Sequence, residues 1–289
     1  MVGVFVFLLP WRSVLHPLPF PFILPFHQRG MKIGVARVRD EADHKRVKKL
    51  CESDDGWEEI YKKGHKHIYS QSMGKSSIEM FKARVVWNVS ADVLYDTLHD
   101  SEYRSKWDKC VINSKDIGFI NPNNDICYYA LKTVSPIRPR NFVIQRSWKD
   151  YRNDKLLCSH SVCHEDFPPV NGYVRATTFV CGYHIQTDNK GCTLTFVSHT
   201  DPRGKIPTWL VNRISKSMAP KALDKLHKAA REYPEWKRKT RPNWKPWSNV
   251  DQSVDLPRVD LKKCEPQEYE NFGVDESGTT EEPKGDDSD

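Results

Sequence analysis

The chain has 289 residues, of which 38% are hydrophobic, and a formal net charge of +7. This length suits one domain of about 200 residues with flanking segments, or two small domains. No apolar stretch reaches the roughly 20 residues of a membrane-spanning helix, which argues against an integral membrane protein.

Charge is distributed unevenly along the chain. Residues 249–289 contain 13 acidic residues against four basic ones, a balance of −9, which leaves about +16 on residues 1–248. A basic body with an acidic tail predicts an anionic partner, either a membrane surface or nucleic acid. The eight cysteines form no CxxC pair. They favour free thiols in a reducing compartment, and we expect neither a metal site nor a cofactor.

The first predicted elements follow an apolar leader. Residues 1–30 are interrupted by prolines and lack the basic start and cleavage site of a signal peptide, so we expect them to lie outside the fold. Residues 39–51 are compatible with a helix, and residues 57–89 contain strand-like pieces. Residues 90–107 are predicted as one helix, because Ser90 is a good N-cap and a broken apolar stripe follows it.

A run of strands and a final helix follow. The helix is predicted over residues 206–233, with Pro207 near its first turn and a kink or break at Pro220. Consecutive strands with helices at the ends favour an antiparallel sheet and an α+β fold. The strand-like segments, rich in β-branched and aromatic residues and separated by turn signals, are residues 125–132, 141–148, 155–164, 172–186 and 192–200.

Four stretches together resemble the START (StAR-related lipid-transfer) domain family: LYDTLHDSEYRSKWD, SPIRPRNFV, TDPRGKIPTWLVN and APKALDKLHKAAREYPEWK. Within the family, the likeness is to the phosphatidylcholine-transfer subgroup, including its PCTP-like phospholipid-transfer members. The resemblance implies a helix-grip fold, in which a curved antiparallel β-sheet surrounds a long C-terminal helix and encloses an apolar lipid tunnel. The lipid-binding domain is expected over residues 37–236, a basic-aromatic extension over 237–248, and an acidic disordered tail over 249–289.

The pair Arg104 and Asp108 is the first candidate for the lipid site. A base placed four residues before an acid is the weaker order in an exposed helix, and exposed pairs contribute little. By resemblance, Arg104 engages the lipid phosphate and Asp108 orients its guanidinium. The spacing alone also allows a solvated pair at a helix end.

The remaining headgroup positions come from the resemblance alone. They are Tyr129, Leu131, Phe142, Phe179 and Cys181. In the family's choline pocket, a tryptophan corresponds to Tyr129, a valine to Leu131, two tyrosines to the phenylalanines and a glutamine to Cys181. The pocket stays aromatic, which suits an ammonium ion, but it loses two hydroxyls and an amide. Phosphatidylethanolamine is therefore expected alongside phosphatidylcholine, and simple core filling remains open for each aromatic residue.

The loop TDPRGKIP resembles a gate at the start of the last helix. Its basic and flexible residues, with the following tryptophan, are expected to form a lid that contacts the membrane: Arg203, Gly204, Lys205, Pro207 and Trp209. In the tail, Thr279 precedes two glutamates and is a candidate phosphorylation site, although a solvated tail without regulation is the favoured reading.

The leading hypothesis is a non-catalytic phospholipid carrier, monomeric and cytoplasmic, that contacts anionic membrane surfaces peripherally. The sequence contains no GxSxG motif and no set of residues that organises bond chemistry, so we expect no enzyme. One alternative is a lipid-hydrolysing enzyme, for which His160 or His184 would have to act as a base. A less favoured alternative is a basic nucleic-acid binder, although no RRM, KH or zinc-finger signature is present.

Overall fold

The structure, a computed structural model, describes residues 32–74, 78–135, 137–204, 206 and 218–265. The predicted leader over residues 1–30 lies outside the described residues. The same holds for Lys205, Pro207, Trp209 and Thr279.

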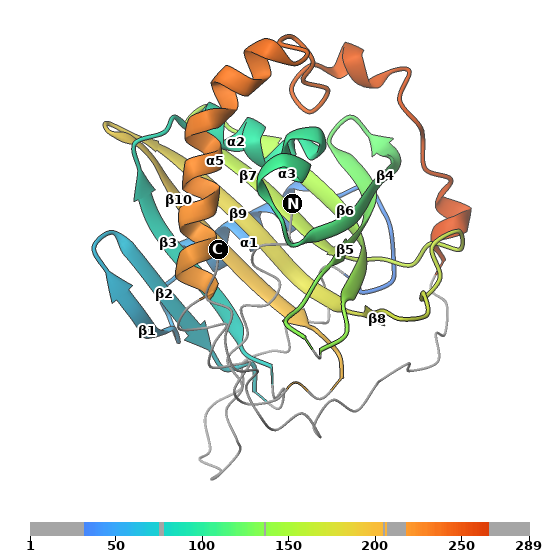
Figure 1. Cartoon of the computed structure of the whole chain (residues 1–289), viewed down its shortest axis with the longest axis horizontal. Helices are drawn as coiled ribbons and strands as arrows, with labels where there is room; N and C mark the ends of the chain where they lie inside the picture. Colours follow the sequence, from blue (N-terminus) through green and yellow to red (C-terminus); the bar gives the residue numbers. More distant parts are fainter. Residues whose placement is uncertain (1–31, 75–77, 136, 205, 207–217, 266–289) are drawn as a thin grey trace.

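A single sheet forms the centre of the molecule (Figure 1). Its strands follow the order β1-β2-β3-β10-β9-β7-β6-β5-β4, all antiparallel, and the short β8 pairs with β6 in parallel. The strands are β1 (Glu58–Lys63), β2 (Lys66–Gln71), β3 (Met80–Trp87), β4 (Val111–Asn121), β5 (Asn124–Leu131), β6 (Arg140–Asp150), β7 (Asp154–Ser161), β8 (Val174–Arg175), β9 (Thr177–Asp188) and β10 (Gly191–Asp201).

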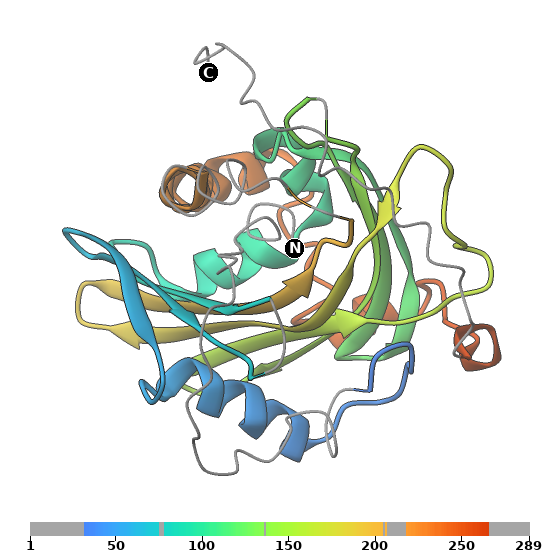
Figure 2. The same ribbon diagram turned by 90° about the horizontal axis from the view of Figure 1, so that it is seen from below.

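The sheet is curved, and its two faces carry different helices. On the concave side lie α2 (Ala91–His99), α3 (Ser101–Trp107) and α5 (Ala219–Lys239), as Figure 2 shows. On the convex side α1 (Glu41–Glu52) packs against β7, β9 and β10. The predicted α+β fold, a curved antiparallel sheet that grips a long C-terminal helix, is confirmed.

The concave face holds the main hydrophobic core. Alternate side chains of the strands point into it, as the period of two in a strand requires. Cys127, Tyr129 and Leu131 come from β5, while Leu223 and Leu226 cover them from α5. Because α5 buries one apolar side and exposes a charged one, the sheet can grip it while the other side faces solvent.

The predicted single helix over residues 90–107 is wrong. It is two helices, because Asp100 leaves the helical conformation with φ −72° and ψ 98° and caps α3 by accepting a hydrogen bond from the backbone N–H of Tyr103 (3.0 Å). The second carboxylate oxygen of Asp100 binds Lys237 (2.7 Å) and the hydroxyl of Tyr233 (3.1 Å) on α5. A long-range ion pair therefore fixes the break.

The C-terminal segment also differs from its prediction. Residues 249–265, expected to be disordered, pack on the domain and include two short 3₁₀ helices, η2 (Val250–Ser253) and η3 (Leu261–Cys264). Phe119 of β4, a strand that the sequence pattern did not predict, donates to the carbonyl of Pro257 (2.8 Å) and accepts from Val259 (3.0 Å). A side chain at Gly118 would lie 2.7 Å from the Pro257 carbonyl oxygen, so glycine allows this close approach.

The last described helix ends later than predicted, and residues 207–217 of the predicted helix lie outside the described residues. Pro220 lies in the first turn of α5, where a missing N–H costs no hydrogen bond, so α5 begins at the predicted break. The helix continues through Pro234 to Lys239, past the predicted domain end at residue 236.

The position of α1 depends on a glycine in the sheet. Asp40 and Asp43 form a capping box that starts the helix. A Cβ atom on Gly182 would collide with Cγ1 of Val47 and lie 3.7 Å from Sγ of Cys51. The helix can therefore lie directly on β9 only because this residue has no side chain.

We expect Gly182→Ala to lower the free energy of unfolding by about 1–3 kcal/mol, because the added methyl group overpacks the contact with Val47. Denaturant unfolding checks the value. Val47→Ala makes room for the added methyl group. In the double variant, the loss of unfolding free energy should therefore be about 1 kcal/mol smaller than the sum of the two single losses. Strictly additive losses would contradict this account.

Candidate functional site

Arg104 and Asp108 form a buried ion pair inside the grip. Both Nε (3.2 Å) and Nη2 (2.9 Å) of Arg104 donate to Oδ2 of Asp108. Only 9% of Arg104 and 4% of Asp108 are exposed. The alternative of a solvated surface pair is therefore wrong.

The pair leaves part of the guanidinium available. Asp108 uses one oxygen for Arg104, and its other oxygen accepts from the backbone N–H of Cys110 (3.2 Å). No residue in the described part of the chain accepts a hydrogen bond from Nη1 of Arg104. Since a guanidinium has five N–H donors and no acceptor, this edge suits an anionic oxygen such as that of a phosphate.

Tyr129 and Phe142 lie beside this guanidinium. Their rings stack at 4.8 Å with an interplanar angle of 14°, and Cζ of Arg104 lies 5.8 Å from the centre of the Tyr129 ring. The two residues are paired across β5 and β6, which explains the stack. The Tyr129 hydroxyl is buried and has no hydrogen-bond partner among the described residues.

Cys181 and Tyr183 complete the inner wall from β9. Burial raises the pKa of the Cys181 thiol to about 12, and the nearby Arg104 charge acts in the opposite direction. Burial also raises the pKa of Tyr183 well above its usual range, again against the Arg104 charge. Tyr183 was not predicted, although strand alternation places it on the same face as Cys181.

Leu131 and Phe179 lie further from the ion pair. Leu131 is fully buried in the same core as Tyr129. Phe179 is half-buried on β9 and packs against His199 at 4.6 Å. The structure thus brings Arg104, which is paired with Asp108, close to Tyr129, whereas Phe179 packs against His199 of β10.

The described part of the gate loop is fixed by an arginine that the sequence analysis missed. Arg140 is fully buried, and it donates to the carbonyls of Pro202 (3.1 Å), Arg203 (2.9 Å) and Arg138 (2.7 Å). Arg203 has φ 56° and Gly204 has φ 74°, so the chain turns sharply there. Arg140 lies two residues before Phe142 on β6, so strand alternation could have predicted that its side chain faces inward.

A second buried ion pair joins Arg146 of β6 to Asp125, which lies on β5 four residues before Tyr129. Nε of Arg146 donates to Oδ1 of Asp125 (2.7 Å), and its Nη2 binds Oδ2. Burial raises the pKa of Asp125, and the Arg146 charge opposes this. The sequence analysis also missed this pair, because an inward-facing charge looks like any surface charge until its partner strand is known.

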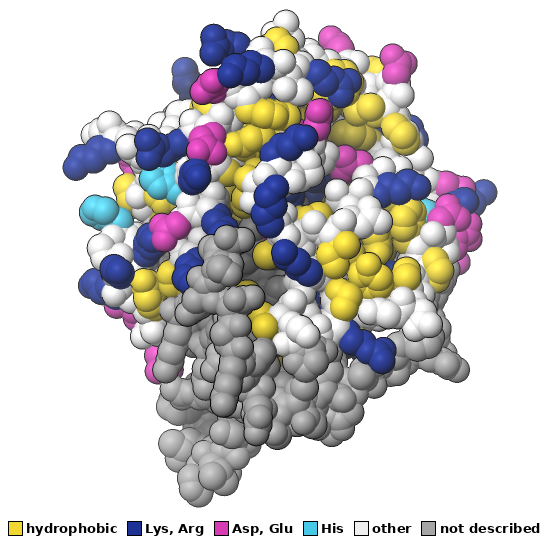
Figure 3. All heavy atoms as spheres, in the orientation of Figure 1, with side chains coloured by type: hydrophobic (Ala, Val, Ile, Leu, Met, Phe, Trp, Pro, Cys, Tyr) yellow, Lys and Arg dark blue, Asp and Glu magenta, His cyan; other side chains and the backbone are white. Residues whose placement is uncertain are grey.

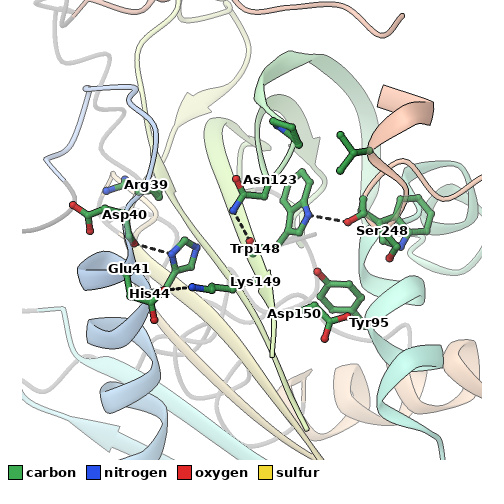
Figure 4. A pocket seen from close by; sticks show the side chains of 13 residues that line it. Arg39, Asp40, Glu41, His44, Tyr95, Asn123, Trp148, Lys149, Asp150 and Ser248 are labelled. Atoms are coloured by element: carbon green, nitrogen blue, oxygen red, sulfur yellow. Dashed lines mark hydrogen bonds and ion pairs between the residues drawn. The ribbon is translucent and has the colours of Figure 1, made fainter. Parts of the chain in front are cut away.

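Two cavities among the described residues flank the C-terminal segment. One, of about 330 Å³, lies between the start of α1, the end of β6 and residues 247–250, and Figure 4 shows Tyr95 and Trp148 at its wall. The other, of about 290 Å³, lies beside Arg146 and Trp244. Both are lined by Trp148 and Trp247, and neither is lined by the predicted headgroup residues.

One group of side chains in the described part of the chain has the geometry of a metal site. Ligand atoms of Glu52, Asp154 and His184 lie within 4.8 Å of one another. The ammonium of Lys48 contacts both carboxylates, so a cation already balances them. The absence of a metal site stays a prediction.

The comparisons with known proteins give the family. A model of the START domain matches residues 37–237, most of the chain. The chain belongs to the START domain family. It is therefore a protein of a lipid-binding and lipid-transfer family whose members are generally non-catalytic.

Its relatives differ in their degree of similarity. The chain is 37% identical to START domain-containing protein 10 of Mus musculus over 249 residues, 85% of each chain. It is 26% identical to the phosphatidylcholine transfer protein of Rattus norvegicus over 171 residues, 57% of this chain and 78% of that protein. The predicted likeness to the phosphatidylcholine-transfer proteins is thus the more distant one.

Solved structures agree with the sequence comparison. The crystal structure of human STARD10 has a TM-score of 0.76 at 36% identity and covers 81% of this chain and 96% of that chain. Human StAR-related lipid transfer protein 5 has a TM-score of 0.61 at 19% identity, covers 67% and 95%, and supports the fold alone. Among the described residues, no helix is long and apolar enough to cross a membrane.

A buried histidine packs against Trp148 and Trp247, the two residues that line both cavities. The His99 ring stacks on Trp247 at 5.5 Å and meets Tyr95 and Trp148 edge-on. Burial, together with the charges of Arg146 and Lys155, lowers the pKa of His99 well below its usual value. The folded protein therefore keeps this ring neutral where the unfolded chain binds a proton.

We expect the free energy of unfolding to fall as the pH drops below about 6.5, with His99 contributing about 1.4 kcal/mol per pH unit. The sign follows because only the unfolded state takes up the proton in this range. Urea unfolding between pH 7.5 and 5 checks it, with His99→Asn as the comparison. If the unfolding free energy of both proteins fell equally with pH, the role of His99 would be contradicted. Part of the fall should remain in His99→Asn, because His160 is also buried with a lowered pKa.

Proposed function

We propose that this protein carries one glycerophospholipid, phosphatidylcholine or phosphatidylethanolamine, between membranes. The lipid lies in an internal tunnel with its phosphate on Arg104. The observation that carries the proposal is the buried Arg104–Asp108 pair, which keeps guanidinium donors open on the concave side of the sheet. A buried cation with unused donors is costly unless an anion joins it.

The physics of acyl chains explains why a carrier needs this fold. Each methylene group moved from water into an apolar interior contributes about 0.8 kcal/mol. A curved sheet with an apolar inner face and a helix across it supplies such an interior. The aromatic residues Tyr129 and Phe142 would lie near the headgroup, and Leu131, Phe179 and Cys181 would complete its walls.

Transport without catalysis fits the chemistry of the candidate site. Burial raises the pKa of Cys127 and Cys181 to about 12, so both thiols stay protonated and are weak nucleophiles. The two histidines considered for a hydrolase are engaged elsewhere, His160 with Arg39 and His184 near Asp154. These contacts support a carrier over the lipid-hydrolysing alternative.

Membrane contact would use the outer side of α5 and the gate loop. Figure 3 shows Lys and Arg side chains spread over the face on which α5 lies. The exposed bases of this helix are Lys221, Lys225, Lys228, Arg231, Arg238 and Lys239. Each base near an anionic surface contributes on the order of 1 kcal/mol, which suits reversible docking of a cytoplasmic monomer. Eight free cysteines also fit the reducing cytoplasm.

Part of the basic-aromatic extension packs on the domain. Trp247 donates to Asp96 (2.7 Å), and its carbonyl accepts from the Trp148 ring N–H (3.0 Å). Lys245 also binds Asp96. These contacts hold residues 245–247 against the domain, so docking would depend on α5 and the gate rather than on Trp247.

We expect Arg104→Ala to lower phospholipid loading by about 10- to 100-fold, the effect of losing one or two charge-assisted hydrogen bonds of about 1.5–3 kcal/mol. Mass spectrometry of the protein after incubation with mixed phosphatidylcholine and phosphatidylethanolamine vesicles measures the loaded fraction. Arg84→Ala is the matched control, because Arg84 pairs with Asp54 at the surface and should load normally. Normal loading by a folded Arg104→Ala protein would remove Arg104 from the site.

A further inference from the structure

The hydroxyl of Tyr129 is an unexplained polar group inside the candidate site. Tyr129 is 2% exposed, and its oxygen has no hydrogen-bond partner among the residues that the structure describes. A buried hydroxyl without a partner costs free energy, so it points to a partner that arrives with the ligand.

The neighbours of Tyr129 limit what that partner can be. Phe142 is stacked on the ring at 4.8 Å, and the Arg104 guanidinium lies over it at 5.8 Å. A trimethylammonium group binds to the face of an aromatic ring. Phe142 and Arg104 already pack against the faces of the Tyr129 ring. The ring edge, with its hydroxyl, is what remains for the headgroup.

The hydroxyl acts as a neutral hydrogen-bonding group. Burial raises the pKa of Tyr129 well above its usual range, so the oxygen keeps its proton and both of its lone pairs. The open donors of Arg104 suit the phosphate, while Asp108 is already bound to Arg104 and to the Cys110 N–H. An ammonium N–H near this site therefore has the Tyr129 oxygen as an unused acceptor.

We propose that Tyr129 selects a primary ammonium headgroup, so that the protein prefers phosphatidylethanolamine to phosphatidylcholine. This inference rests on the proposed function and assigns the specificity to one oxygen atom. An ethanolamine ammonium donates N–H bonds to that oxygen, whereas a choline nitrogen carries methyl groups and has no N–H to donate.

The test uses the full chain and equimolar vesicles of the two lipids with identical acyl chains. The phosphatidylethanolamine-to-phosphatidylcholine ratio bound by each protein is read by mass spectrometry. Tyr129→Phe, which removes only the hydroxyl, should lower this ratio about tenfold, the effect of one hydrogen bond to a charged group. The control Tyr128→Phe should not change it, because Tyr128 points into the opposite face of β5 and packs near Phe167.

A second measurement needs no variant. In wild-type protein, phosphatidylethanolamine and its N-methyl and N,N-dimethyl forms should all bind more tightly than phosphatidylcholine, because only the trimethylated nitrogen has no N–H left to donate to the Tyr129 oxygen. Equal loss of both lipids in Tyr129→Phe would place the hydroxyl on the phosphate or an ester and overturn the inference, as would an unchanged ratio or a flat methyl series. Wild-type protein that binds neither lipid would instead overturn the proposed function.

Discussion

The candidate site depends on the burial of the Arg104 guanidinium away from water. Moving an ion out of water is costly, and the cost is offset only by close pairing and by further hydrogen bonds. Asp108 supplies the pairing for Arg104, and the Cys110 N–H steadies Asp108 in turn. Because Arg104 and Asp108 are i and i+4 on a short helix, the site needs α3 to be separate from α2, and the break at Asp100 provides that separation.

The grip is closed by polar contacts at its margins rather than by apolar packing alone. Asp100 ties the α2–α3 junction to Lys237 on α5, and Asp96 ties α2 to Trp247. At the loop after β10, Arg140 donates to the carbonyls of Pro202 and Arg203. Each contact joins segments far apart in the sequence. These polar contacts add to the apolar packing of α5 and the strands in the main core.

Membership of the START family fixes the architecture, but the cargo is decided by a few side chains within it. The family resemblance placed Tyr129, Phe142 and Cys181 on the inner wall, and the structure adds their environment. Tyr129 carries an orphan hydroxyl, Phe142 covers its ring, and Cys181 is a neutral thiol. Under the proposed function, a headgroup at this wall would meet the Tyr129 oxygen as a neutral acceptor, so the number of N–H donors on the headgroup would affect its affinity.

The sequence by itself determined the α+β class, most of the strands, the N-cap at Ser90 and the candidate pair Arg104–Asp108, since these depend on local pattern, capping and resemblance. It did not reveal β4, the ordered residues 249–265 or the Asp125–Arg146 pair. Strand β4 is largely exposed and polar, and it is held by β5 and by Pro257, which lies more than a hundred residues away. Whether a charge faces water or a buried partner depends on which strands become neighbours, and only the tertiary structure decided that.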